Sequence, residues 1–163
     1  MSEEEKILWN NILNFNIDDP ESSFTFTDRL CRENDWSMEY ALRAVIEYKK
    51  FIFLICTSQN AQTPSDQVDQ VWHLHLLYTR SYWTEFCKGL LNKEIHHGPT
   101  KGVEERGLFK DQYSSTLEEY FQKFNEKPPK DIWPNPQKRI SEIHFSRVNR
   151  HSHWVIPKLK FNL

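Results

Sequence analysis

The feature that most constrains the fold is a stretch of helical periodicity with a well-marked start near residue 64. Thr63, Pro64 and Asp66 follow the order of a helix N-terminus: a hydroxyl cap, a proline in the first helical position and an acid three residues after the cap. The apolar residues that follow recur at intervals of three and four, so a helix is predicted over 64–90. Its core-facing stripe contains Val68, Trp72, Tyr82, Phe86 and Leu90.

Helices are predicted elsewhere by the same kind of pattern. Ser37 is a good N-cap for a long helix of about 20 residues, whose apolar positions are Met38, Leu42, Val45, Ile52 and Ile55. Further helices are expected over 3–15, 24–35 and 103–125. The chain has only four glycines, which disfavours sheet-rich architectures. We therefore expect an all-α, single-domain bundle of four or five helices with an extended, irregular C-terminal tail.

The domain division follows from the prolines near residue 128. Pro128 and Pro129 cannot continue the preceding helix, so we expect a helical domain over 1–127. Residues 128–163 form a basic, Pro- and Trp-containing C-terminal segment that we expect to pack on the same domain. This segment has seven basic and two acidic residues, whereas residues 1–40 have ten acidic and three basic ones. A basic patch can bind nucleic acid, but the charge complement favours a segment that folds back or is solvated, so nucleic acid is not the expected partner.

Several function classes are disfavoured. No apolar run approaches the roughly 20 residues that span a bilayer, and the acidic start is unlike a signal peptide. The three cysteines form no disulfide framework, so a cytoplasmic location is expected. The sequence contains neither a phosphate-binding glycine loop nor a GxSxG nucleophile motif.

The predicted helix 64–90 carries the best candidate site. At 100° per residue, Asp69 and His73 lie one turn apart on one edge, where they can share a proton or both bind a cation. His75 lies about 160° away from His73, inside the apolar stripe. A regular helix therefore cannot direct both histidines to one metal ion.

His96 and His97 follow in the loop NKEIHHGPTKG. If that loop returns along the helix, one of these imidazoles can join Asp69 and His73 in a two-histidine, one-carboxylate set, which suits zinc or non-haem iron. The required return is long, because residue 91 of a continuous helix lies about 27 Å from His73. The expected supporting residues are Trp72, His75, Arg80 and Tyr82, and Lys101 is a candidate anion-binding residue.

Structural explanations of the same residues remain open. His75 in an apolar stripe is typical of a core histidine bonded to a carbonyl or a tyrosine. Asp69 and His73 can form an ordinary exposed pair, and His96 and His97 an ordinary polar loop. The alternative function is a non-enzymatic interaction module, in which aromatic surface residues and the C-terminal segment bind a partner protein. No catalytic residue is assigned.

The segment VDQVWHLHLLYTRSYWTEFC resembles the VDxVWHxH…Y…C block of the glycine-rich domain-containing protein-like family, known from plants and from bacterial relatives. The segments TPSDQVD, HHGPTKG and DIWP are similar to the bacterial members, and the likeness covers roughly residues 30–157. The resemblance implies that the motif positions are Asp69, Trp72, His73, His75, Tyr82 and Cys87. It implies no mechanism, and this chain lacks the glycine-rich region of the plant proteins.

Overall fold

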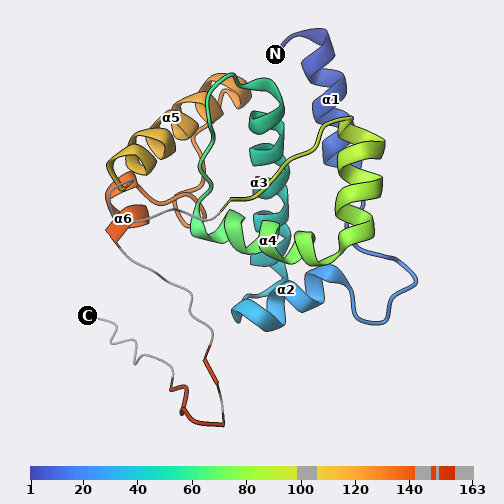
Figure 1. Ribbon diagram of the computed structural model, residues 1–163, viewed down its shortest axis with the longest axis vertical. Coiled ribbons are helices and arrows are strands. Elements are labelled where there is room, and N and C mark those ends of the chain that lie inside the picture. Colours follow the sequence, from blue (N-terminus) through green and yellow to red (C-terminus); the bar gives the residue numbers. More distant parts are fainter. Residues whose placement is uncertain (99–105, 142–147, 150, 157–163) are drawn as a thin grey trace.

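The computed structural model describes residues 1–98, 106–141, 148, 149 and 151–156. Within these residues the protein is all-α, as predicted, with seven helices and no strand (Figure 1). The helices are α1 (Glu3–Asn14), α2 (Phe26–Asn34), α3 (Met38–Thr57), α4 (Asp66–Leu77), η1 (Arg80–Leu91), α5 (Arg106–Phe124) and α6 (Pro136–Ser141).

Helix α3 is the centre of the bundle and packs against α1, α2, α4 and α5 (Figure 1). Ser37 caps it as predicted, since the Ser37 hydroxyl accepts a hydrogen bond from the Tyr40 N–H. The buried face of α3 is made by Ala41, Ala44, Val45, Tyr48, Phe51, Ile52, Phe53 and Leu54. Met38 and Leu42, which the spacing assigned to the core, are about half exposed, at 45% and 49%.

The first two helices have strong N-terminal caps. Ser2 and Glu5 form a reciprocal capping box at α1, and Thr25 and Asp28 form another at α2. Each box satisfies backbone N–H groups that have no partner within the helix. These local signals explain why the predicted ranges 3–15 and 24–35 agree closely with the observed helices.

The predicted helix over 64–90 is wrong in one respect: the chain forms two helices there, α4 and η1. The backbone leaves the helical region at Tyr78 (φ −87°, ψ 64°), and the Tyr78 N–H pairs with the His75 carbonyl. Neither glycine nor proline lies at the break. The Tyr78 ring packs against Phe26 of α2, with ring centroids 5.3 Å apart, so a tertiary contact overrides the local helical pattern.

The start of α4 also differs from the prediction. Ser65, not Thr63, is the cap, because its hydroxyl accepts from the Val68 N–H. Thr63 instead donates its backbone N–H to the Thr116 hydroxyl of α5 at 3.0 Å. Thr63 precedes Pro64, and a residue before proline favours extended backbone. Extended backbone leaves the Thr63 N–H free to bond outside the helix.

Helix η1 is wound as a π-helix through all its 12 residues. Long π-helices are rare, and wide turns of this kind occur often at functional sites. Its buried residues Tyr82, Phe86 and Cys87 face the interior, and η1 contacts both α4 and α1.

Within the C-terminal segment, residues 131–139 pack on the bundle. Ile132 and Trp133 are buried, and the Trp133 indole N–H donates to the buried Glu47 carboxylate of α3 at 2.8 Å. Arg139 of α6 forms an ion pair with Asp66 at 2.7 Å and donates to the Pro64 carbonyl. This contact ties α6 to the start of α4.

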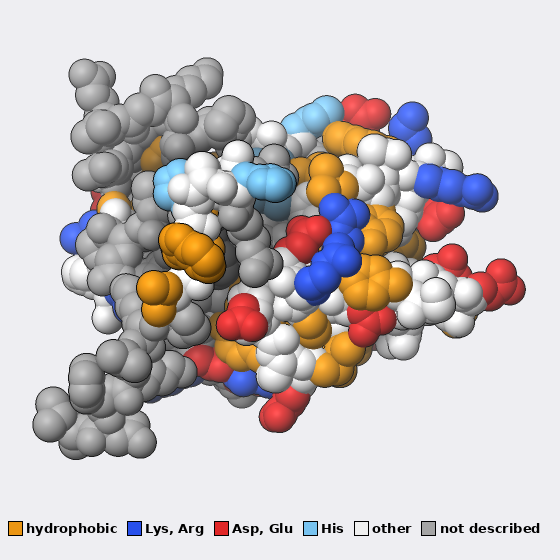
Figure 2. All heavy atoms as spheres, turned by 90° about the horizontal axis from the view of Figure 1, so that it is seen from below, with side chains coloured by type: hydrophobic (Ala, Val, Ile, Leu, Met, Phe, Trp, Pro, Cys, Tyr) orange, Lys and Arg blue, Asp and Glu red, His pale blue; other side chains and the backbone are white. Residues whose placement is uncertain are grey.

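Exposed large apolar side chains occur on several helices and in the described residues 154–156. On the lower face, hydrophobic side chains are interspersed with acidic and basic ones (Figure 2). Among the residues that the structure covers, none of the helices is both long and apolar enough to cross a membrane.

Candidate metal centre

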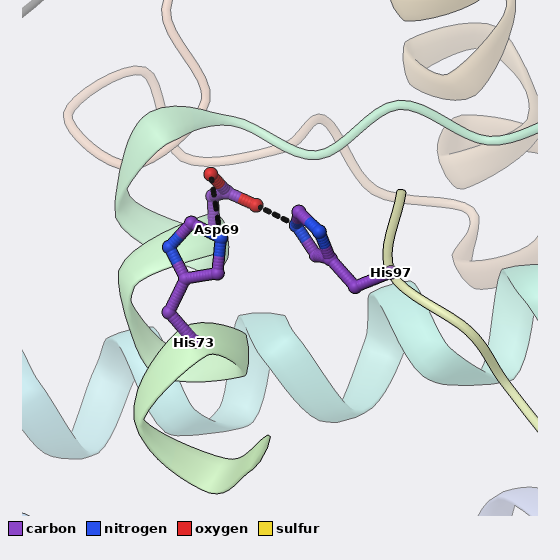
Figure 3. A group of neighbouring side chains, drawn as sticks. All are labelled: Asp69, His73 and His97. Carbon is purple, nitrogen blue, oxygen red and sulfur yellow. Dashed lines mark hydrogen bonds and ion pairs between the residues drawn. The ribbon is translucent and has the colours of Figure 1, made fainter. Parts of the chain in front are cut away.

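Asp69 and His73 lie one turn apart on α4, as their spacing predicts. The His73 Nε2 atom is 3.8 Å from Asp69 Oδ2 (Figure 3). The Asp69 side chain is 19% exposed and that of His73 is 49% exposed. The carboxylate is therefore sheltered, whereas one edge of the imidazole faces solvent.

The third member of the cluster is His97. Its Nε2 atom is 2.7 Å from Asp69 Oδ1, and its ring centroid is 4.5 Å from that of His73 (Figure 3). Since an ionised carboxylate only accepts hydrogen bonds, the imidazole N–H donates to Asp69. The loop after η1 therefore does return to Asp69 and brings His97 to it. The return is short enough because the chain breaks at Tyr78, whereas a continuous helix would have placed residue 91 about 27 Å from His73.

A hydrogen-bonded relay connects α4 to the segment that carries His97. The Trp72 indole N–H donates to the Tyr82 hydroxyl at 2.9 Å, and the Tyr82 hydroxyl donates to the Ile95 carbonyl at 2.6 Å. The Trp72 ring also meets His97 edge-on, with centroids 4.4 Å apart. Trp72 and Tyr82, two of the expected supporting residues, thus connect α4 to the segment that carries His97.

The three side chains form a set of atoms that can ligate one metal ion. Their ligand atoms all lie within 4.8 Å of one another. In a tetrahedral zinc site with metal–ligand distances of about 2.0–2.2 Å, neighbouring ligand atoms are about 3.4 Å apart. The separations from Asp69 are 2.7 Å at Oδ1 and 3.8 Å at Oδ2, on either side of that value but at different oxygens. Coordination through one carboxylate oxygen therefore requires rearrangement of the side chains, and two imidazoles with one carboxylate leave further positions open.

The remaining predicted residues are placed differently. His96 is 71% exposed, pairs with Glu94 at 3.5 Å and contacts the Trp83 ring, so it is not part of the cluster. Arg80 is 89% exposed and pairs with Glu85 at 3.3 Å. Lys101 lies outside the described residues.

His75 is a fully buried histidine that the structure keeps apart from the three-residue cluster. Its Nδ1 atom is 2.8 Å from the Tyr48 hydroxyl and its Nε2 atom is 3.2 Å from the Ser81 hydroxyl. Burial, with a smaller contribution from Lys49, lowers the pKa of His75 to about 3. The imidazole is therefore neutral at physiological pH.

The chain of contacts Ser81–His75–Tyr48 has the order of a nucleophile, a base and an orienting group. The position of the imidazole proton opposes that function. The best acceptor for the proton of the buried Tyr48 hydroxyl is His75 Nδ1, which puts the imidazole proton on Nε2, facing Ser81. A base for Ser81 needs a free Nε2 lone pair. The His75–Ser81 contact therefore bridges the α4–η1 break. A tyrosine partner was one of the expectations for a core His75, but the sequence identifies neither Tyr48 nor Ser81, because neither forms a motif with His75.

Searches among the curated proteins and among the solved structures found no match to this chain. A sequence model of the UCP032817-like family matches residues 23–139. The matched region contains α2 to α5, including Asp69, His73 and His97.

Proposed function

This chain belongs to the UCP032817-like family, and we propose that it binds one divalent transition-metal ion, zinc or iron, through Asp69, His73 and His97. The observation that carries the proposal is the convergence of two imidazoles and a carboxylate, from elements 28 residues apart in sequence, with all ligand atoms within 4.8 Å. Imidazole suits both zinc and iron, and three protein ligands are typical of sites that keep a position for water or substrate.

The burial of the cluster supports an open site. Asp69 and His97 are sheltered, so the metal would be held on the protein side, whereas the half-exposed His73 marks the side that solvent reaches. A metal ion in such a position lowers the pKa of bound water and polarises carbonyl or phosphoryl oxygens. Because the His97 Nε2–H points at Asp69, binding through that nitrogen would require the imidazole proton to move to Nδ1. Protons compete with the metal for the ligand atoms, so affinity would fall as pH falls.

The likeness to the VDxVWHxH block remains a prediction. The proposed site would explain why the block contains these residues. The block would supply two of the three ligands, Asp69 and His73, and the two relay residues Trp72 and Tyr82. His97 would come from the separate HHGPTKG segment.

The experiment is elemental analysis of untagged protein, followed by equilibrium titration with zinc and, without oxygen, with ferrous iron. We expect about one ion per chain. The variants Asp69→Asn and His97→Gln should lose that ion, whereas His96→Gln is the matched control and should keep it. Wild-type protein that binds neither metal would refute the proposal, as would a loss of metal in His96→Gln equal to that in His97→Gln.

A second candidate function is the binding of a partner protein, favoured by the exposure of Trp154, Val155 and Ile156, at 96%, 63% and 82%. Surface apolar residues in succession are typical of docking segments. Trp133 does not belong to this surface, because it is buried against Glu47. A Trp154→Ser variant that retains all the partners captured by the wild-type chain would exclude this function for the 154–156 segment.

A further inference from the structure

We infer that Tyr82 is a positioning residue of the proposed metal site: its hydroxyl, through Ile95, sets where His97 stands relative to Asp69 and His73. The inference rests on the proposed function and adds to it the group that governs the third ligand. Tyr82 touches none of the three proposed ligands in a hydrogen bond, so its effect is exerted through the segment that precedes His97.

The position of the Tyr82 hydroxyl is fixed from two sides. It accepts from the Trp72 indole N–H on α4 and donates to the Ile95 carbonyl, and all three residues are at most 5% exposed. Trp72 is adjacent to His73 in sequence, and Ile95 precedes His97 by two residues. One hydroxyl therefore links the helix that carries two proposed ligands to the segment that carries the third.

Further contacts limit how the 93–97 segment can move. The Lys93 N–H donates to the Cys87 carbonyl at 3.0 Å, and the Lys93 ammonium donates to the Ile55 carbonyl at 3.0 Å. These contacts hold the start of the segment on η1 and α3. Among the described hydrogen bonds to residues that precede His97 in the segment, the one from Tyr82 to Ile95 is the nearest to His97. The edge contact between Trp72 and His97 then sets the tilt of the imidazole.

This geometry predicts a specific consequence of deleting one oxygen atom. In Tyr82→Phe the ring still fills its buried space, but the Trp72 N–H and the Ile95 carbonyl lose their shared partner. His97 should then sample positions away from Asp69. Removal of groups that orient metal ligands typically lowers metal affinity about 10- to 100-fold, and we expect a loss in that range.

The test uses cobalt(II) and zinc(II) as probes on the full chain. Tyr48→Phe is the matched control, because it removes a hydroxyl that is equally buried but bonded to His75 instead of Ile95. We expect Tyr82→Phe to weaken binding of both ions and to shift the visible cobalt(II) spectrum towards that of His97→Gln. Tyr48→Phe should retain the wild-type spectrum and affinity, even if it lowers the melting temperature.

Wild-type affinity in Tyr82→Phe would overturn the inference, and so would equal losses in Tyr82→Phe and Tyr48→Phe, which would indicate general destabilisation. If wild-type protein binds neither ion, the metal proposal itself fails, and amide hydrogen exchange of the metal-free chain tests the positioning role. Faster exchange at residues 95–97 in Tyr82→Phe, but not in Tyr48→Phe, would support that Tyr82 positions His97. Unchanged exchange in both variants would overturn it.

Discussion

The buried His75 should make the protein lose stability in mild acid. In the folded chain its pKa is lowered to about 3, against 6.5 for an ordinary histidine. Because the unfolded chain binds this proton more tightly, the stabilisation is complete above pH 6.5 and is lost as pH falls towards 3. From about pH 8 to about pH 5, linkage predicts a loss of about 2 kcal/mol from this single group, and the full loss is about 5 kcal/mol.

The environment of His75 explains why the imidazole resists protonation. It lies among the rings of Phe15, Phe26, Tyr82 and Phe86, whose centroids are 5.1–6.2 Å from that of the imidazole. Among the described residues, the nearby charge that contributes is the Lys49 ammonium, which disfavours a second positive charge. A loss of about 2 kcal/mol is a substantial part of the 5–15 kcal/mol that stabilises a typical domain.

The assay is urea unfolding at several pH values between 8 and 5, for wild type, His75→Gln and His96→Gln. His75→Gln removes the titrating group and should be less stable at pH 8, but it should lose about 2 kcal/mol less than wild type on acidification. His96→Gln is the control for an exposed histidine and should follow the wild-type curve. If wild type and His75→Gln lose equal stability between these pH values, the explanation from His75 burial is refuted.

Three other substitutions test contacts outside the candidate site. Ser65→Ala removes the cap of α4 and should cost about 1 kcal/mol in urea unfolding, with helicity otherwise retained by circular dichroism. Trp133→Phe leaves the buried Glu47 carboxylate without its indole donor and should lower the free energy of unfolding by about 1–3 kcal/mol, whereas a change under about 0.5 kcal/mol would contradict a tight C-terminal contact. Trp154→Ser should change stability by less than about 0.5 kcal/mol, because the ring is 96% exposed; a larger loss would show that the ring packs on the domain.

The helical class and most helix starts were predictable because their signals are local. Ser37 and the acidic first turn of α1 mark helix starts that neighbouring structure does not alter. The inner face of α3 was harder to predict, because the helix is apolar on most sides and several helices surround it. Its small residues Ala41 and Ala44 are fully buried, while the larger Leu42 remains half exposed. Close approach of neighbouring helices, not side-chain size, decides which positions are covered.

The site was half predictable for a related reason. Asp69 and His73 belong to one helix, and their separation of four residues fixes their proximity. The position of His97 depends on the break at Tyr78, where the ring packs on Phe26. No glycine or proline in the sequence marks this break. A long-range contact of this kind leaves little trace in local periodicity.

Which of His96 and His97 reaches Asp69 can, in contrast, be inferred from the sequence once the loop is known to pack on the bundle. In extended backbone, residues two apart share a face and immediate neighbours point to opposite faces. Ile95 is the apolar residue of NKEIHHG, and it is buried at 4% exposure. His97 therefore shares its inward side at 19% exposure, while His96 points outward at 71%. The isoleucine that anchors the segment also selects which imidazole reaches Asp69, so exchanging the order of residues 95 and 96 should turn the imidazole of His97 away from Asp69 and abolish metal binding.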